Sequence, residues 1–243
     1  MKTAYVNLRY TNDERAALFH EGLRRLGYKV SLKVPLGPKN HDDIFVTWNR
    51  IGKAADIASR FTKSGCTVLV AENATWGNTF AGENWYHIAR TYHNTADTFD
   101  YEGPERFDSL GVGLKPFKDP DGSVIILLQR GIGSPPVRAP LRFKLDAIKD
   151  YPGAYLRKHP GNYKPARPLS EDLERYTKAV TWGSGAAIAA SIEGLEVVSY
   201  MPKWIGAHEP TELSRLVMLR RLAWAQWRYS EIESGEAFKR LIA

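Results

Sequence analysis

One stretch, from Lys178 to Pro202, most constrains what this chain can fold into. The apolar run 179–182 predicts a short buried strand, and Gly183-Ser184-Gly185 predicts a tight turn. The alanine-rich residues 186–193 predict a short helix, and the apolar run 197–200 predicts a second strand. This order of strand, glycine turn, helix and strand is one βαβ unit.

The glycine turn of this unit stands at the carboxyl end of its first strand. Gly194 stands where the helix should end. Open α/β sheets bind ligands at the carboxyl ends of their strands, and free amides at a helix start attract phosphate. From these residues alone, a phosphate site and a βαβ unit without a ligand are equally good interpretations.

The rest of the chain repeats the alternation. Apolar runs predict strands at 3–8, 28–34, 44–48, 66–71, 123–129 and 154–157, and amphipathic stretches predict helices at 12–26, 52–63, 141–149, 169–176, 209–229 and 236–242. Alternating strands and helices favour an α/β fold with a mainly parallel, doubly wound sheet. Residues 75–122 show no such periodicity.

Two segments of the chain resemble each other. Val46-Thr47-Trp48-Asn49-Arg50-Ile51-Gly52 and Val180-Thr181-Trp182-Gly183-Ser184-Gly185 each precede a helix that ends in glycine. We therefore expect two Rossmann-like domains. The alternative is coincidence, because βαβ units are built from a small set of sequence patterns. The expected ranges are 1–118 for an acceptor domain, 119–208 for a donor-binding domain, and 209–243 for helices packing back on the first domain. Within 75–118, irregular sequence with many aromatic residues is expected to wrap a cleft; these are Trp76, Trp85, Tyr86, Tyr92, Phe99, Tyr101 and Phe107.

Composition sets further bounds. At 243 residues the chain can bury one sizeable core or two small ones. No apolar run approaches a membrane span, so no membrane partner is expected. A single cysteine, Cys66, excludes disulfides and cysteine metal sites, and with no apolar leader it favours a cytoplasmic location. The net charge of +7 favours polyanions or phosphorylated substrates, or else reflects only a solvated basic surface.

Three short motifs carry a family resemblance: Gln129-Arg130-Gly131, Arg157-Lys158-His159-Pro160-Gly161 and Thr181-Trp182-Gly183-Ser184-Gly185. Their order resembles the C-terminal half of GT-B glycosyltransferases, in which two Rossmann-like domains face across a cleft and the second binds a sugar nucleotide. GT-B enzymes are usually much longer. Both domains here would be minimal, as in a trimmed catalyst or a scaffold that has lost catalysis.

The tail and the front of the chain narrow the resemblance. Trp224-Ala225-Gln226-Trp227 with residues 231–236, and residues 46–50 with 70–73, are similar to small phage-encoded glycosyltransferase-like proteins. The resemblance implies a nucleotide-sugar donor, most often a UDP-sugar, no tightly bound cofactor and no metal requirement. For some relatives it also implies hydroxymethylated bases of phage DNA as acceptors.

On the donor side, Arg157, Lys158 and His159 stand in a row where a strand should end. Two cations and an imidazole donor can neutralise a departing diphosphate. Ser184 and Gly185 at a helix start are the expected second side of the same site. Arg130 and Gly131 follow another strand, and the glycine would let a ligand approach the backbone.

On the acceptor side, the residue predicted to act as general base is Glu72, which follows an apolar strand. Asn49, Arg50, Asn73 and Trp76 are the predicted substrate contacts. His87 and His93 are weaker candidates for the base, because a lone histidine is more often structural. Asp42 and Asp43 are expected at the opposite end of the sheet and solvated.

Other chemistries find less support. Asp119-Pro120-Asp121 resembles a metal-binding D-x-D pattern, but the surrounding Pro and Gly favour a surface turn. The dinucleotide fingerprint and the P-loop are absent from the sequence, which argues against a dehydrogenase or an NTPase.

The acceptor stays open between hydroxymethylated DNA and a polysaccharide or small molecule, and a non-catalytic DNA-binding protein is a third hypothesis. For DNA, the aromatic residues of 75–118 would stack on a flipped base. Arginines of the last long helix would contact phosphates, or else form an ordinary basic face; they are Arg215, Arg220, Arg221 and Arg228. The sequence does not fix the oligomeric state.

Overall fold

The computed structural model describes residues 2–8, 13–94, 101–133, 135–161 and 165–242. These residues form two compact α/β units. Unit 1 contains the described residues up to His93 and those from Trp224 onward, while unit 2 contains Asn94 and Tyr101–Ala223.

Unit 1 is built on a mixed sheet whose main path has the strand order β11-β6-β4-β3-β1-β2, with β5 paired to β6. The four strands β2, β1, β3 and β4 are parallel, and β6 and β11 are antiparallel to their neighbours. The bounds are β1 Thr3–Asn7, β2 Lys29–Ser31, β3 Ile44–Trp48, β4 Val68–Asn73, β5 Thr79–Phe80, β6 Glu83–Arg90 and β11 Gln226–Arg228.

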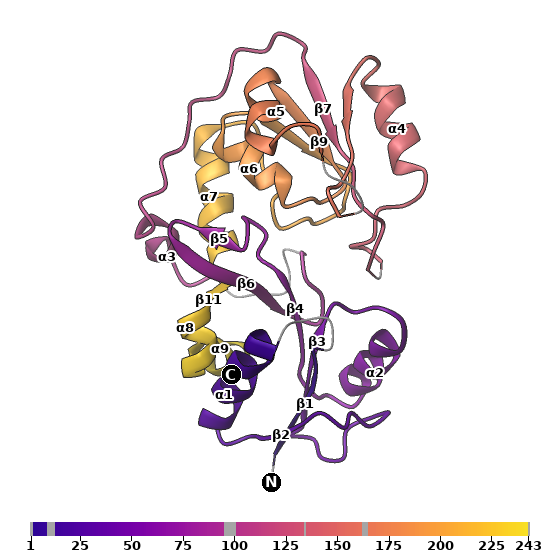
Figure 1. The fold of residues 1–243 in the computed structure, drawn as a ribbon, viewed down its shortest axis with the longest axis vertical. Helices are drawn as coiled ribbons and strands as arrows, with labels where there is room; N and C mark the ends of the chain where they lie inside the picture. The colour runs from indigo at the N-terminus through magenta and orange to yellow at the C-terminus, as the bar shows by residue number, and fades with distance from the viewer. Residues whose placement is uncertain (1, 9–12, 95–100, 134, 162–164, 243) are drawn as a thin grey trace. The chain divides into compact units, whose positions relative to one another are not determined.

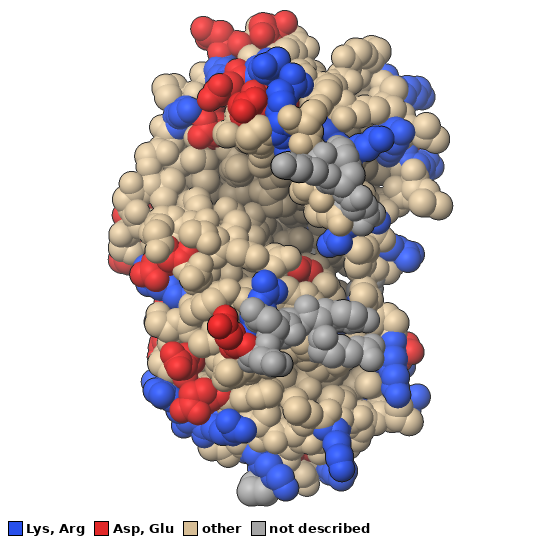
Figure 2. Space-filling model, in the orientation of Figure 1, with Lys and Arg blue, Asp and Glu red and all other residues tan. Residues whose placement is uncertain are grey.

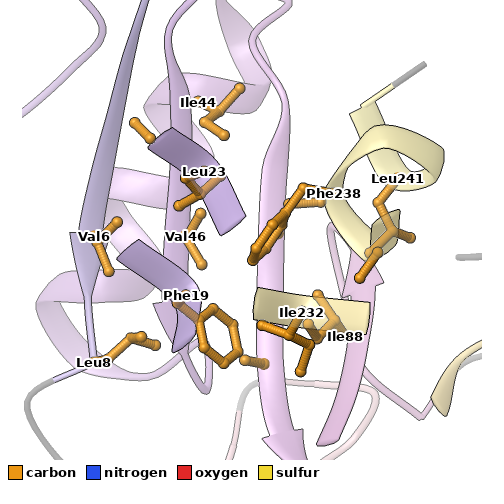
Figure 3. Close-up of a cluster of buried hydrophobic side chains, with 14 of the residues drawn as sticks. Val6, Leu8, Phe19, Leu23, Ile44, Val46, Ile88, Ile232, Phe238 and Leu241 are labelled. Carbon is orange, nitrogen blue, oxygen red and sulfur yellow. The ribbon is translucent and has the colours of Figure 1, made fainter. Parts of the chain in front are cut away.

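Helices cover both faces of this sheet. They are α1 (Asp13–Arg25), α2 (Gly52–Lys63), α8 (Tyr229–Ser234) and α9 (Glu236–Ile242). On one face, α2 buries its apolar positions at helical spacing, namely Ala54, Ile57, Ala58 and Phe61. On the other face, α1, α8 and α9 share one core with the sheet, in which Phe19 and Leu23 meet Ile232, Phe238 and Leu241 (Figure 3).

Unit 2 has a fully parallel sheet with the order β10-β9-β7-β8. Its strands are β7 Val124–Leu127, β8 Tyr155–Arg157, β9 Lys178–Thr181 and β10 Glu196–Ser199, and its helices are α3 Glu105–Asp108, α4 Phe143–Asp150, α5 Leu169–Arg175, α6 Ala186–Ile192 and α7 Glu212–Ala223. Phe143 and Ala147 of α4 pack on Ile126 and Val180. Figure 1 shows α6 on the opposite side of the sheet from α4.

The predicted fold class is confirmed: the chain is a two-unit α/β protein in which strands and helices alternate. The βαβ unit of the Lys178–Pro202 stretch is present as β9, α6 and β10, with β9 and β10 parallel. Gly194 follows α6 at φ 83°, a left-handed conformation that glycine adopts without strain. A side chain there would also meet the Pro116 carbonyl oxygen at 2.1 Å.

Two predicted elements were wrong. Part of the segment predicted as irregular is β6, in which Trp85, Tyr86, His87 and Ile88 are all buried. A strand buried on both faces has no alternating pattern, and its aromatic and polar residues concealed it. The long helix predicted over 209–229 ends at Ala223, because the following residues pair with β6 as β11.

The compact units also divide the chain at other places than the expected domain ranges. The segment around α3 belongs to unit 2, because Arg220 of α7 pairs with Asp108 and the Arg106 guanidinium donates to the Ala223 carbonyl. α7 likewise belongs to unit 2, and only the residues after it return to unit 1.

The contact between α1 and α8 is close enough to test by mutation. A Cβ at Gly22 would lie 1.9 Å from the Ile232 carbonyl oxygen. Gly22→Ala should therefore lower the free energy of unfolding by about 1–3 kcal/mol in a urea titration, despite the higher helix propensity of alanine. Gly37→Ala is the matched control, because nothing lies within 4 Å of its added Cβ. Equal stability of the two variants would contradict this packing.

Candidate functional site

Three loops meet at the carboxyl edge of the unit 2 sheet. They follow β7, β8 and β9, which are parallel neighbours, so their ends lie on the same edge. The side-chain oxygen of Gln129 accepts a hydrogen bond from the Gly183 amide at 2.9 Å, joining the first loop to the third. A Cβ at Gly161 would lie 2.9 Å from Arg130 Cδ and 3.0 Å from His159 Nδ1, so these side chains are close neighbours.

His159 is held as a neutral donor in this cluster. Burial, and then the positive charge of Arg130, lower the pKa of its imidazole. Its Nδ1 atom accepts a hydrogen bond from the Gly161 amide at 2.9 Å. In neutral imidazole the proton then resides on Nε2, which can donate to an anion. Arg130 and Lys158 on either side are exposed, so the loops offer two cations and one neutral donor.

Arg157 does not belong with its two neighbours. Its guanidinium forms an ion pair with the buried carboxylate of Asp172 and donates to the Arg167 carbonyl at 3.3 and 3.2 Å. The Arg157 side chain is only 10% exposed. The row of basic residues is thus divided: Arg157 anchors the end of β8, while Lys158 and His159 belong to the loop.

The turn at Ser184 and Gly185 is mostly occupied by hydrogen bonds within the protein. The Ser184 amide donates to Thr181 Oγ1 at 2.9 Å, and the Ala186 amide donates to Ser184 Oγ at 3.3 Å. With the Gly183 amide bound to Gln129, the Gly185 amide is the donor of this turn for which we see no acceptor within the described residues. The capacity of this turn for phosphate is therefore smaller than its sequence predicts.

In unit 1, the predicted acceptor residues follow β3 and β4. Glu72 and Asn73 end β4; Glu72 is half-buried, with Oε1 accepting from the Asn73 amide at 2.8 Å. Asn73 is exposed, and its Oδ1 accepts from Asn78 at 3.0 Å. Asn49 directly after β3 has φ 61°, in the left-handed region, which asparagine adopts more readily than most residues other than glycine. Asn49 and Glu72 remain candidates because they stand at the carboxyl ends of the neighbouring parallel strands β3 and β4.

Arg50 and Trp76 are packed into the unit. The Arg50 guanidinium donates to the Thr91 carbonyl at 2.9 Å and to Ser59 Oγ at 3.1 Å, and it lies over the Tyr92 ring. Trp76 is 7% exposed and stacks on Phe80 with ring centroids 4.7 Å apart. Both side chains stabilise the loops beside the strand ends, and neither presents its polar group to solvent.

Among the other carboxylate and histidine candidates, Asp43, His87 and His93 are buried structural residues. Asp43 is fully buried, not solvated as expected, because it accepts from the amides of Thr3, Lys39 and Asn40 at 2.9–3.0 Å. Asp42 is exposed. Burial, together with His93, lowers the pKa of His87 to about 3, and burial lowers that of His93 to about 4. His87 Nδ1 accepts a hydrogen bond from the side-chain Nε2 of Gln226 at 2.8 Å, beside the β6–β11 pairing.

The sequence analysis missed a cavity of about 700 Å³ in unit 1. It lies at the end of β1, between α1 and α2, which cover opposite faces of the sheet. Its described lining is mostly aliphatic, with Asn7, His20 and Lys53 as polar members. His20 Nε2 is buried and makes no hydrogen bond within the described residues. Asn7 as the last residue of an apolar strand and Lys53 in the first turn of a helix could have indicated it.

No group of His, Cys, Asp and Glu able to hold a metal ion occurs among the residues that the structure describes. The D-x-D-like residue Asp121 accepts hydrogen bonds from Ser123 and Thr177, as a turn residue does. Within the described ranges, no helix is both long enough and apolar enough to span a bilayer.

Comparison with known proteins gives a structural likeness. The fold is similar to two solved structures from Thermosulfurimonas dismutans, KpsC beta Kdo 2,4 transferase and KpsC beta Kdo 2,7 transferase. The first has a TM-score of 0.57 and 15% identity, covering 98% of each chain. The second has a TM-score of 0.57 and 12% identity, covering 98% of this chain and 99% of the other. At these identities the likeness shows the fold. No family model and no curated protein sequence matches the chain.

The structural role of Arg157 can be separated from a role in binding. Asp172→Ala should lower the free energy of unfolding by about 3–5 kcal/mol, because it leaves the Arg157 charge buried without its carboxylate. Asp146→Ala, which removes the exposed partner of Arg142, is the control and should cost far less. Chemical denaturation of both variants measures the difference. If Asp172→Ala changes the free energy of unfolding only slightly, Arg157 becomes a candidate for phosphate binding again.

The buried histidines should make stability depend on pH. In the folded protein, the pKa values of His87 and His93 lie below the ordinary value near 6.5. Between about pH 6.5 and pH 4, these histidines are therefore protonated in the unfolded chain and neutral in the folded chain. The free energy of unfolding should therefore fall with decreasing pH, by up to about 1.4 kcal/mol per pH unit for each histidine. Urea titrations at about pH 7 and pH 5 should show a smaller fall in His93→Phe than in wild type. An identical fall would contradict the assignment to His93.

Proposed function

We propose that this protein is a glycosyltransferase that moves a sugar from a nucleotide-sugar to a hydroxyl group. The observation that carries the proposal is the cluster of Arg130, Lys158 and His159 at the carboxyl edge of a parallel sheet. The Kdo transferases of similar fold support the same class of reaction. In this proposal unit 2 binds the donor.

The chemistry of the cluster suits a departing nucleotide. As the bond between the sugar and the phosphate breaks, negative charge accumulates on the phosphate oxygens. Arg130 and Lys158 supply positive charge, and the Nε2 proton of neutral His159 supplies a hydrogen bond that persists at neutral pH. Cationic side chains can thus carry the role that a metal ion has in other transferases. The donor nucleotide predicted from sequence, UDP, is one member of the class this site would accept.

On the acceptor side, unit 1 offers Glu72 as the general base and the cavity lined by His20 and Lys53 as a binding site. A carboxylate at a strand end can accept the proton of a hydroxyl nucleophile, and a cavity of about 700 Å³ has the size of a small-molecule site. We propose a carbohydrate hydroxyl as the acceptor, since Asn7, His20 and Lys53 give this cavity polar groups that can bind the hydroxyls of a sugar.

The hydroxymethylated-DNA acceptor has less support from the side chains. The aromatic residues expected to stack on a base are largely buried, among them Trp76, Trp85 and Tyr86; Phe99 lies outside the described residues. Three of the four arginines expected on phosphates are engaged within the protein: Arg215 with Glu212, Arg220 with Asp108, and Arg228 over the ring of Trp85. The fourth, Arg221, is exposed. We therefore place DNA behind a carbohydrate among the acceptors to be assayed.

The donor side is tested by calorimetric titration with UDP-, GDP- and CMP-sugars, including nucleotide-activated Kdo. Arg130→Ala/Lys158→Ala should weaken binding of the preferred donor by about tenfold or more, because each charge-assisted contact is lost. Arg175→Ala, at an exposed position of α5, is the control. The proposal is wrong if none of these donors binds.

The acceptor side is tested by transfer assays with oligosaccharides and hydroxymethylated DNA. Glu72→Gln should lower the transfer rate by about 10²–10⁴-fold with unchanged donor affinity. Full activity in this variant would remove Glu72 as the base while leaving the class of reaction in place.

A further inference from the structure

The helix α4 of unit 2 and the turn before it expose apolar side chains to water. The inward residues of the helix, Phe143 and Ala147, are buried against the sheet. On the outward side of α4, Leu145 is 68% and Ile148 36% exposed, and Leu141, in the turn just before the helix, is 101% exposed. Leu145 and Ile148 are three residues apart and lie on the same side of the helix. Leu141 adds a third exposed apolar side chain in the turn before the helix. A helix covering a sheet normally places polar residues on its solvent side. On α4 the exposed residues Lys144 and Lys149 share that side with Leu145 and Ile148.

Positive charge flanks these three apolar side chains. Arg138, Arg142, Lys144 and Lys149 are exposed around it, and Figure 2 shows Lys and Arg side chains gathered over the part of unit 2 that carries α4. Both carboxylates of the helix have partners: Asp146 pairs with Arg142, and Asp150 accepts from the Tyr200 hydroxyl. The side of α4 that meets water therefore combines leucine side chains with a surplus of cations.

We propose that the α4 stripe, defined as Leu141, Leu145 and Ile148 with their flanking cations, docks on an anionic lipid surface. The aliphatic side chains enter the boundary between headgroups and acyl chains, and Arg138, Lys144 and Lys149 contact lipid phosphates. This is attachment to one face of a bilayer, which does not require a membrane-spanning segment. A second copy of the chain is a poorer occupant, because two identical stripes would bring the same cations together.

Vesicle sedimentation tests the apolar part. Wild type should pellet with vesicles containing about one third phosphatidylglycerol, much less with pure phosphatidylcholine, and less again at about 0.5 M salt. Leu141→Ser/Leu145→Ser should weaken the partition coefficient about tenfold or more, since two inserted leucines are lost. The matched control is Leu213→Ser/Val217→Ser on α7, whose residues are 71% and 43% exposed in the same unit. This control should bind as wild type does.

A second pair of variants tests the charge. Lys144→Glu/Lys149→Glu should abolish the preference for phosphatidylglycerol, whereas Arg60→Glu/Lys63→Glu on α2 makes the same change in net charge and should retain it. All four variants alter exposed side chains, and thermal unfolding checks that they fold.

Three results would overturn the proposal: no sedimentation of wild type, equal binding to neutral and anionic vesicles, or equal losses in test and control variants. A dimer in analytical ultracentrifugation that Leu141→Ser/Leu145→Ser dissociates would assign the stripe to a second copy instead.

Discussion

The pairing of β11 with β6 is the interaction on which unit 1 depends. It brings residues from the end of the chain onto a sheet formed by the first ninety or so, and it places α8 and α9 over α1. The pairing is reinforced by buried polar contacts, in which Gln226 accepts from the Thr75 amide at 2.9 Å and donates to His87 at 2.8 Å. Burying these groups is tolerable only because each meets a partner. Without β11, the His87 side of the sheet and the apolar face of α1 would both lose their cover.

This arrangement explains which parts of the fold could be predicted from sequence. β3, α2 and β9 follow local rules, with short apolar runs, helical spacing and glycine ends, and the predictions lie close to the observed bounds. β6 and β11 depend on each other across more than a hundred residues. Their residues are aromatic and polar, because the strands are buried on both faces and carry a hydrogen-bond network. A local pattern cannot reveal a strand whose partner is so distant.

In the candidate site, too, the features that follow from local sequence were predicted, and those that depend on distant residues were not. Strand ends and glycine loops pointed to Arg130, Lys158 and His159, which do gather at one sheet edge. The sequence could not show that the neighbouring Arg157 turns inward, because its partner Asp172 lies on a helix whose packing is a tertiary property. The same limit applies to Arg50, whose acceptor Thr91 is remote in sequence. The sequence can thus predict that a basic residue stands at a strand end. It cannot predict whether the side chain is paired with another group of the protein.

Arg157 stabilises the end of β8, whereas Lys158 after it is exposed, and this difference determines which positions tolerate amino-acid substitution. The base of the β8 loop is fixed by a buried ion pair, and the first loop is tied to the third by Gln129 and Gly183. The exposed residues beyond these anchors contribute little to the core. Substitutions at Arg130, Lys158 and the neighbouring loop positions can therefore accumulate without unfolding unit 2. If unit 2 binds the donor as proposed, substitutions in these loops can alter donor selectivity while the protein stays folded, and a library confined to them would sample mostly folded proteins.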